Sequence, residues 1–232
     1  MTTQRTIGLL GGMSWESTVP YYQQINQTVR ARLGGLHSAR ILLHSVDFQE
    51  IASLQSQGDW DEAGRRLAAI ARQLEQGGAD LLVLCTNTMH KVADAITAAV
   101  QIPLLHIADP TASAIKAAGM SQIGLLGTRF TMEQDFYRAR LALHGITALV
   151  PEAEDRDTVH DIIYQELCQG QIKPASRETY LRIIDKLAAQ GAQGIILGCT
   201  EIGLLIGPQD IELPLFDTTR LHAVAAAEKA LE

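Results

Sequence analysis

Short runs of apolar residues alternate with longer amphipathic stretches along the whole chain. Each half contains four such runs, rich in leucine, isoleucine and valine: 6–10, 40–46, 81–85 and 104–107 in the first half, and 122–126, 146–150, 194–198 and 213–216 in the second. Runs that are apolar at nearly every position are typical of parallel strands buried on both faces. Helical patterns lie between these runs, so the sequence predicts βαβ units with parallel sheets.

Two of the amphipathic stretches carry signals for where their helices begin and end. The stretch 61–76 has apolar residues on one face and is followed by Gly77-Gly78, which is typical of a helix C-terminus. The stretch 176–190 has the same pattern and is followed by Gly191, and Ser176 is placed to cap its first turn. We expect one helix over each stretch.

The two halves of the chain also repeat one another in three short sequences. IGLLG at 7–11 recurs at 123–127, GADLLVL at 78–84 resembles GAQGIIL at 191–197, and IPL at 102–104 resembles LPL at 213–215. The three pairs occur in the same order and at nearly the same spacing. This register aligns Thr86 with Cys199.

The repeat predicts an α/β fold of two similar Rossmann-like domains, 1–107 and 108–216, each built on a parallel sheet. Two halves related by a pseudo-two-fold axis bring their equivalent loops together. Ligands of such sheets bind beyond the carboxyl ends of the strands. We therefore expect an active site in the cleft between the domains, with Thr86 and Cys199 flanking whatever binds there.

Composition and charge exclude several classes of protein. The 232 residues include 26 acidic and 19 basic ones, and this excess of negative charge argues against nucleic acid or an anionic membrane as partner. No run approaches the roughly 18 apolar residues of a membrane-spanning helix. The N-terminus resembles no secretory signal, so we expect a cytoplasmic protein. The three cysteines lack the spacing of a disulfide framework or a metal site, and we expect no metal.

Polar residues follow several of the predicted strands, where a ligand would bind. The glycines after the first strand do not have the spacing of a dinucleotide fingerprint, and no Walker motif follows them. Hydroxyl and amide groups, with backbone N–H groups at the starts of the following helices, suit a small anionic ligand. The residues that we expect to contact it are Met13, Ser14, Asn87, Thr88, Thr128, Thr200 and Glu201.

The three cysteines differ in their surroundings. Most isolated cysteines are small buried hydrophobic residues, and this interpretation suits Cys85 at the end of its strand and Cys168 on the apolar side of a helix. Cys199 lies between Gly198 and polar neighbours at the end of a strand. Cys199 is therefore the candidate for a reactive thiol.

The motifs around these residues resemble those of the aspartate/glutamate racemase superfamily, over essentially the whole chain. The matching residues are Ile7–Met13, Thr86-Asn87-Thr88-x-His90 and Gly198-Cys199-Thr200-Glu201, and the run Gly11–Thr18 resembles the branch of broad-specificity racemases. The resemblance implies an amino-acid substrate, catalysis without a cofactor, and a homodimer. It also implies that the last helix, at about 217–232, packs on the first domain.

The superfamily's mechanism uses two acid/base groups, one on each face of the substrate's α-carbon. Most members have a cysteine in both motifs, whereas this chain has Thr86 in the first, with Cys85 one residue earlier. A shift of one residue along a strand reverses the direction of a side chain, so we assign Thr86 to catalysis and Cys85 to the core. By analogy with the superfamily, we expect Cys199 to remove the α-proton of an L-amino acid. We expect Thr86 to return a proton, with faster turnover from L to D. His90 is placed to orient a loop or to assist proton transfer, and it is equally compatible with a structural role at the start of a helix. We do not assign it to catalysis.

The resemblance leaves the substrate and the exact reaction open. The positions that correspond to the charged residues of aspartate-selective members are Ile51 and Cys168, and Gln55 and Gln165 are neutral alternatives for contacting the substrate. Because a single cysteine suffices for some chemistry on this scaffold, a maleate isomerase or arylmalonate decarboxylase stays an alternative. A catalytically inert amino-acid sensor is a second one, whereas the glycine pattern disfavours a dinucleotide-dependent oxidoreductase.

Overall fold

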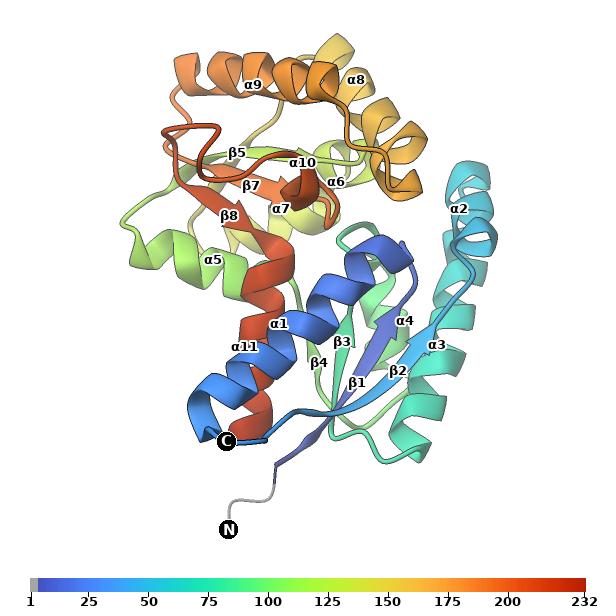
Figure 1. Ribbon diagram of the computed structural model, residues 1–232. Coiled ribbons are helices and arrows are strands. Elements are labelled where there is room, and N and C mark those ends of the chain that lie inside the picture. The colour runs from blue at the N-terminus through green and yellow to red at the C-terminus, as the bar shows by residue number, and fades with distance from the viewer. Residues whose placement is uncertain (1–3) are drawn as a thin grey trace. The chain divides into compact units, whose positions relative to one another are not determined.

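The computed structural model describes residues 4–232 and contains two four-stranded parallel sheets (Figure 1). The chain forms two compact units. The first comprises residues 4–107 together with His222–Glu232, and the second comprises Ala108–Leu221. Each of the eight predicted strands is present, so the predicted α/β fold of two parallel-sheet halves is confirmed.

The sheet of the first unit has the strand order β2-β1-β3-β4. Its strands are β1 (Thr6–Gly11), β2 (Arg40–Ser45), β3 (Leu81–Leu84) and β4 (Leu104–Leu105). Its helices are α1 (Trp15–Leu33), α2 (Phe48–Gln57), α3 (Trp60–Gln76), the 3-10 helix η1 (Thr88–Val92) and α4 (Ala93–Thr97). The last helix, α11 (Thr218–Leu231), begins in the second unit, and its residues from His222 onward belong to the first.

Alternate residues of β1 and β3 point into two separate apolar clusters, one on each face of this sheet. Ile7, Leu9 and Val83 pack against α1 and the alanines of α11. Leu10 and Leu84 pack against α2, α3 and α4. Because both faces of the central strands are covered, their carboxyl ends provide the free edge from which polar loops extend.

The second unit repeats this arrangement with the strand order β6-β5-β7-β8. Its strands are β5 (Gln122–Gly127), β6 (Thr147–Leu149), β7 (Ile195–Gly198) and β8 (Leu215–Asp217). Its helices are α5 (Ala108–Ala117), α6 (Arg129–Glu133), α7 (Asp135–Ala142), α8 (Ala153–Gln165), the 3-10 helix η2 (Leu167–Gln169), α9 (Pro174–Ala189) and α10 (Ile202–Leu205). One face of the sheet packs against α8 and α9, and α5 and α7 contact β8 and β6.

Two expectations from the sequence are wrong in detail. Ser176 does not cap α9: the helix begins at Pro174 after the N-cap residue Lys173, and the Ser176 hydroxyl donates to Glu166 Oε2 at 2.5 Å instead. Proline is favoured at the first helical position because the missing N–H has no intrahelical partner there. The strand β2 is not buried on both faces, since it lies at the edge of its sheet and Leu43 is 46% exposed.

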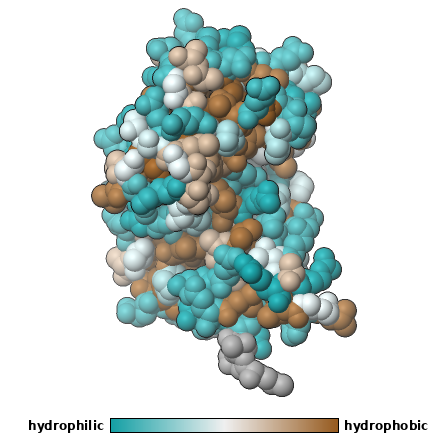
Figure 2. All heavy atoms as spheres, turned by 90° about the vertical axis from the view of Figure 1, so that its left-hand side faces the viewer, coloured by the Kyte–Doolittle hydropathy of each residue, from teal (hydrophilic) through white to brown (hydrophobic). Residues whose placement is uncertain are grey.

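On the face drawn in Figure 2, hydrophobic residues are interspersed with hydrophilic ones and form several separate areas. Within residues 4–232, the helices lack the combination of length and apolar character needed to cross a membrane.

Candidate functional site

The loop after β1 is held in a compact turn by its own side chains. The Gly12 N–H donates to Thr18 Oγ1 at 2.9 Å, and the Thr18 hydroxyl donates to the Ser14 carbonyl at 2.7 Å. Gly12 has φ of +89°, and a Cβ there would lie 2.4 Å from the Val46 carbonyl oxygen. Only glycine permits this close approach between the loops after β1 and β2. Ser14 is thereby fixed and almost fully buried.

Cys85 and Thr86 are adjacent after β3, but their side chains have different surroundings. Cys85 continues the strand, with its N–H donating to the Leu10 carbonyl, and its side chain lies in the apolar cluster under α1 and α11. Burial raises the pKa of the Cys85 thiol. Cys85 is therefore a core residue, as the register of the repeat predicts. Thr86 lies just beyond the strand and is 6% exposed, and Asn87 and Thr88 follow it with side chains that are also mostly buried.

His90 fixes the backbone at Thr86. Its Nε2 lies 3.2 Å from the Ile107 N–H, which can only donate, and its Nδ1 lies 2.7 Å from the Thr86 carbonyl oxygen, which can only accept. Nδ1 therefore carries the proton of a neutral ring. Burial lowers the pKa of His90 well below its ordinary value, and the neighbouring His106 and His222 lower it further. His90 is a positioning residue for Thr86 in this geometry.

His222 extends this support to two further elements. It lies 2.8 Å through Nε2 from the Leu105 carbonyl and 2.9 Å through Nδ1 from the Tyr21 hydroxyl, and its ring packs edge-on against Tyr21. It links α11 with β4 and α1, which lie far apart in the sequence. No local motif marks His222, so sequence reasoning missed it.

Met13 and Gln55 support the same loops from within the first unit. Met13 lies in the apolar cluster with Ile51, and the Gln55 amide donates to the Met89 sulfur at 3.0 Å. Gln55 is thus next to the segment that follows Thr88. Ile51 is buried among apolar side chains, which explains why an uncharged residue occupies this position.

In the second unit, the ends of β5 and β7 approach each other closely. Gly127 pairs with Gly198, and a Cβ on Gly127 would lie 2.8 Å from the Gly198 carbonyl oxygen. The residues that follow these neighbouring strand ends are Thr128 and Cys199. Thr128 caps α6 by accepting from the Thr131 N–H at 3.3 Å.

Cys199 and Glu201 form the most chemically distinctive contact of the site. The Cys199 thiol donates to Glu201 Oε2 at 2.9 Å, and the Thr200 hydroxyl donates to the same oxygen at 2.9 Å. Cys199 is 7% exposed and Glu201 is buried. Burial first, and the Glu201 carboxylate second, raise the pKa of the Cys199 thiol well above its ordinary value. The resting side chain is therefore a thiol with a carboxylate in position to accept its proton.

The start of α11 is hydrogen-bonded to the end of β7 and to the loop that follows it. The Thr218 hydroxyl donates to the Leu197 carbonyl at 2.8 Å, and the Thr219 hydroxyl donates to the Thr200 carbonyl at 3.5 Å. Sequence reasoning did not select these two threonines. The repeat points to their position, because it matches 102–104 with 213–215 and the two threonines directly follow β8.

Cys168, another position singled out from the sequence, has an uncharged side chain. Cys168 lies in η2 and packs partly buried against the apolar cluster of the second unit. In the described part of the chain, no three His, Cys, Asp or Glu side chains gather in a way that could hold a metal ion.

Replacing His90 with asparagine is expected to make stability less sensitive to acid. Because the folded-state pKa of His90 is depressed, the unfolded chain takes up a proton below about pH 6.5 that the folded chain does not. Stability therefore falls with decreasing pH by about 1.4 kcal/mol per pH unit for this one proton. Urea unfolding between pH 5 and 8 should show a shallower acid decline in His90→Asn. The matched control His37→Asn, at an exposed position, should follow the wild type, and equal declines in all three would contradict the prediction.

Replacing Glu201 with glutamine is expected to lower the pKa of Cys199. The variant removes the negative charge beside the thiolate and leaves the burial that also raises this pKa. The pH dependence of iodoacetamide alkylation, measured in a Cys168→Ala background, reports the thiolate directly. The exposed Glu212→Gln variant is the control. An unchanged alkylation pKa in Glu201→Gln would show that the carboxylate does not act on the thiol.

Comparison with known proteins gives one consistent result. The model of the family described as Asp/Glu/hydantoin racemase matches residues 10–226. A candidate Asp/Glu racemase from Yersinia pestis is 59% identical, with 98% of this chain and 100% of that chain covered and a TM-score of 0.91. An aspartate racemase homologue from Pyrococcus horikoshii OT3 is 32% identical, with 98% and 100% covered and a TM-score of 0.84. The broad specificity amino-acid racemase RacX of Bacillus subtilis is 23% identical over 92% of both chains.

Proposed function

Because this chain belongs to the Asp/Glu/hydantoin racemase family, we propose that it is an amino-acid racemase that moves the α-proton with Cys199 and Thr86 and without a cofactor. The observation that carries the proposal is the Cys199 thiol at the end of β7, hydrogen-bonded to the buried carboxylate of Glu201 at 2.9 Å. A thiol held this way is a latent base. Core cysteines such as Cys85 have only backbone and apolar neighbours.

Glu201 generates the base. Its carboxylate accepts the thiol proton, and the resulting thiolate removes the α-proton from an L-amino acid, so that the proton ends on Cys199 sulfur. Thr200 donates to the same Glu201 oxygen and holds the carboxylate toward the thiol. The high pKa of Cys199 makes its thiolate scarce but strongly basic, which suits the removal of a weakly acidic C–H proton.

Thr86 supplies the proton on the other face of the α-carbon. An aliphatic hydroxyl is a far weaker acid than a thiol, but a carbanion is a strong enough base to take its proton. The reverse step needs the Thr86 alkoxide as a base, and this species hardly exists near neutral pH. Turnover from L to D is therefore faster than from D to L.

The substrate is an amino acid with a free α-carboxylate. Negative charge builds up on this carboxylate when the α-proton leaves, and hydrogen-bond donors aimed at it lower the barrier. We assign this role to the polar side chains of Ser14, Asn87, Thr88 and Thr128. Positions 51 and 168 hold the uncharged residues Ile51 and Cys168. The preference for substrates with acidic side chains is therefore weaker than in a site with a cationic residue at those positions, because a charge-assisted hydrogen bond contributes about 1.5–3 kcal/mol.

Solvent deuterium incorporation tests the proposal. The wild-type protein is incubated in D₂O with L- and D-aspartate, L- and D-glutamate and several neutral amino acids. We expect deuterium at the α-carbon, together with inversion, from at least one L-amino acid. A folded protein that exchanges none of them contradicts the proposal. Turnover of maleate or of an arylmalonate would then assign the site to isomerase or decarboxylase chemistry, and tight binding without exchange would assign it to a sensor.

A further inference from the structure

His160 on α8 packs against the start of α6, next to the loop that follows β5. The Arg129 N–H donates to His160 Nδ1 at 3.2 Å. Because a backbone N–H can only donate, Nδ1 is the acceptor and the proton of the neutral ring lies on Nε2. This N–H belongs to the peptide group that joins Thr128 to Arg129. His160 therefore holds the backbone directly after Thr128.

The ring of His160 also contacts two aromatic side chains. It packs edge-on against Phe130 of α6, with 6.0 Å between the ring centroids, and tilted against Tyr164 of α8, with 4.7 Å. Burial raises the pKa of the Tyr164 phenol most, and the charge of the nearby Cys199 raises it further. His160 thus connects the segment after β5 with the surroundings of Cys199.

We propose that His160 is a positioning residue for the substrate: its neutral ring holds the peptide after Thr128 so that the Thr128 hydroxyl contacts the substrate's α-carboxylate. The inference rests on the proposed function, in which Thr128 is one of the donors to this carboxylate. A proton on Nδ1 would oppose the Arg129 N–H, so the protonated ring cannot accept this hydrogen bond. Protonation of His160 therefore releases the backbone at Thr128 and weakens the contact with the carboxylate.

The charges that act on His160 come from α6 and from α8 itself. Burial lowers the pKa of His160 most, and the side-chain charge of Arg129 lowers it further. Asp157 and Asp161 of α8 and Glu133 of α6 act in the opposite direction without offsetting these two causes. Arg129 is itself paired with Asp157 at 3.6 Å. The ring is therefore neutral at neutral pH and gains its proton only in more acidic solution.

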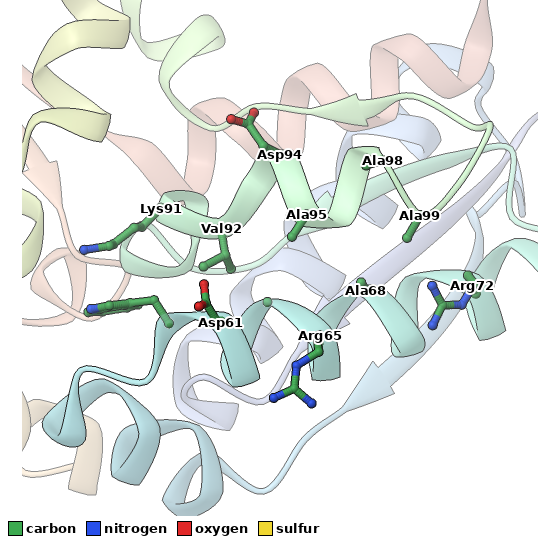
Figure 3. A pocket seen from close by; sticks show the side chains of 12 residues that line it. Asp61, Arg65, Ala68, Arg72, Lys91, Val92, Asp94, Ala95, Ala98 and Ala99 are labelled. Carbon is green, nitrogen blue, oxygen red and sulfur yellow. The ribbon is translucent and has the colours of Figure 1, made fainter.

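His90 supports Thr86 in the first unit but does not share this sensitivity to acid. His90 is 3% exposed, and burial lowers its pKa well below the ordinary value, whereas His160 is half-buried. The next residue, Lys91, lies 4.3 Å from the ring centroid of Trp60 and lines a groove of about 850 Å³ between α3 and the η1–α4 segment (Figure 3). Of the two histidines that support site residues, His160 is therefore the one that takes up a proton in mildly acidic solution.

Two substitutions of His160 separate the hydrogen bond from the ring. His160→Phe keeps an aromatic ring against Phe130 and Tyr164 but has no acceptor. His160→Asn loses the ring, keeps an acceptor oxygen near the place of Nδ1, and cannot take up a proton. For each protein, kcat/KM is measured between pH 5 and 8 with the L-amino acid that the wild type turns over fastest. Dividing each value by that of the wild type at the same pH cancels the titration of Cys199 and Glu201.

The hydrogen bond gives these ratios a defined pH dependence. At pH 8 we expect His160→Phe to have about one fifth of the wild-type kcat/KM, the scale of one hydrogen bond, and His160→Asn to recover most of this loss. As the pH falls, the wild type loses its own hydrogen bond, so both ratios should rise by up to about fivefold. His37→Asn, at an exposed position, is the control and should follow the wild type throughout. Ratios that stay constant with pH, or a His160→Phe variant as active at pH 8 as His160→Asn, would overturn the proposal.

An NMR titration of the wild-type protein tests the same contact without turnover. The Arg129 amide resonance should shift with the same midpoint as the His160 ring, and this shift should be absent in His160→Phe. An Arg129 resonance that ignores the titration of His160 would overturn the inference even in an active racemase. If no amino acid is turned over, the proposed function fails separately, and the dissociation constants of bound amino acids are compared across the same variants instead. Circular dichroism at each pH establishes that every variant is folded.

Discussion

A Cys199→Ser variant is expected to lose α-proton exchange and L-to-D turnover by about a thousandfold or more, since the base in the first step contributes on this scale. Serine keeps the size of the side chain and the hydrogen bond to Glu201 but cannot supply a thiolate. The hydroxyl would have to ionise next to the Glu201 carboxylate, which disfavours a second negative charge. Deuterium incorporation from the L-amino acid that the wild type exchanges fastest is the measurement.

The control for this experiment is Cys168→Ala. Cys168 is another thiol of the same unit, partly buried against the same apolar cluster as Cys199. Its removal should leave exchange within a few-fold of the wild type. If Cys199→Ser exchanged at the wild-type rate, the assignment of Cys199 as the base would be wrong. If both variants lost exchange, the effect would reflect the packing of the unit instead.

The strands could be predicted because a strand that is buried on both faces has an apolar residue at almost every position. The central strands β1, β3, β5 and β7 are apolar at almost every position, and the repeat matches β1 with β5 and β3 with β7. The edge strand β2 contains the apolar run Ile41–Leu43, although Leu43 is 46% exposed. An apolar run alone does not distinguish a central strand from an edge strand, because strand order is decided by contacts distant in sequence.

The site could be predicted only where its residues follow a strand. Thr86 and Cys199 were selected because both directly follow a buried run and because the repeat aligns them. The role of Glu201 as the partner of the thiol depends on a side-chain rotamer that no spacing encodes. The contacts of His222 with Tyr21 and Leu105 join segments more than a hundred residues apart, so only the folded chain shows them.

The equilibrium between enantiomers limits what the asymmetry of Thr86 and Cys199 can do. In an achiral solvent the two enantiomers have equal free energy, so kcat/KM must be equal in the two directions. A low kcat from the D-enantiomer is therefore accompanied by an equally low KM for it. The threonine makes the enzyme slow from the D side without displacing the final mixture from equal amounts.

A Thr86→Cys variant is consequently expected to raise kcat from the D-amino acid by about a hundredfold or more, because a thiol has a reference pKa near 8.5 and supplies a thiolate where the hydroxyl supplies almost no alkoxide. The ratio of the two kcat values should approach one, and the ratio of the two KM values should approach one with it.

Thr86→Ser is the matched control, since it keeps a hydroxyl and should keep the bias toward L. The backbone at this position is held by His90 through the Thr86 carbonyl, so the new thiol would occupy the place of the hydroxyl. Progress curves from each pure enantiomer give all four constants. An unchanged kcat ratio in Thr86→Cys would mean that residue 86 does not transfer the proton, and the search for the second acid/base group would then turn to Ser14 and Thr88, the other buried hydroxyls of the loops after β1 and β3.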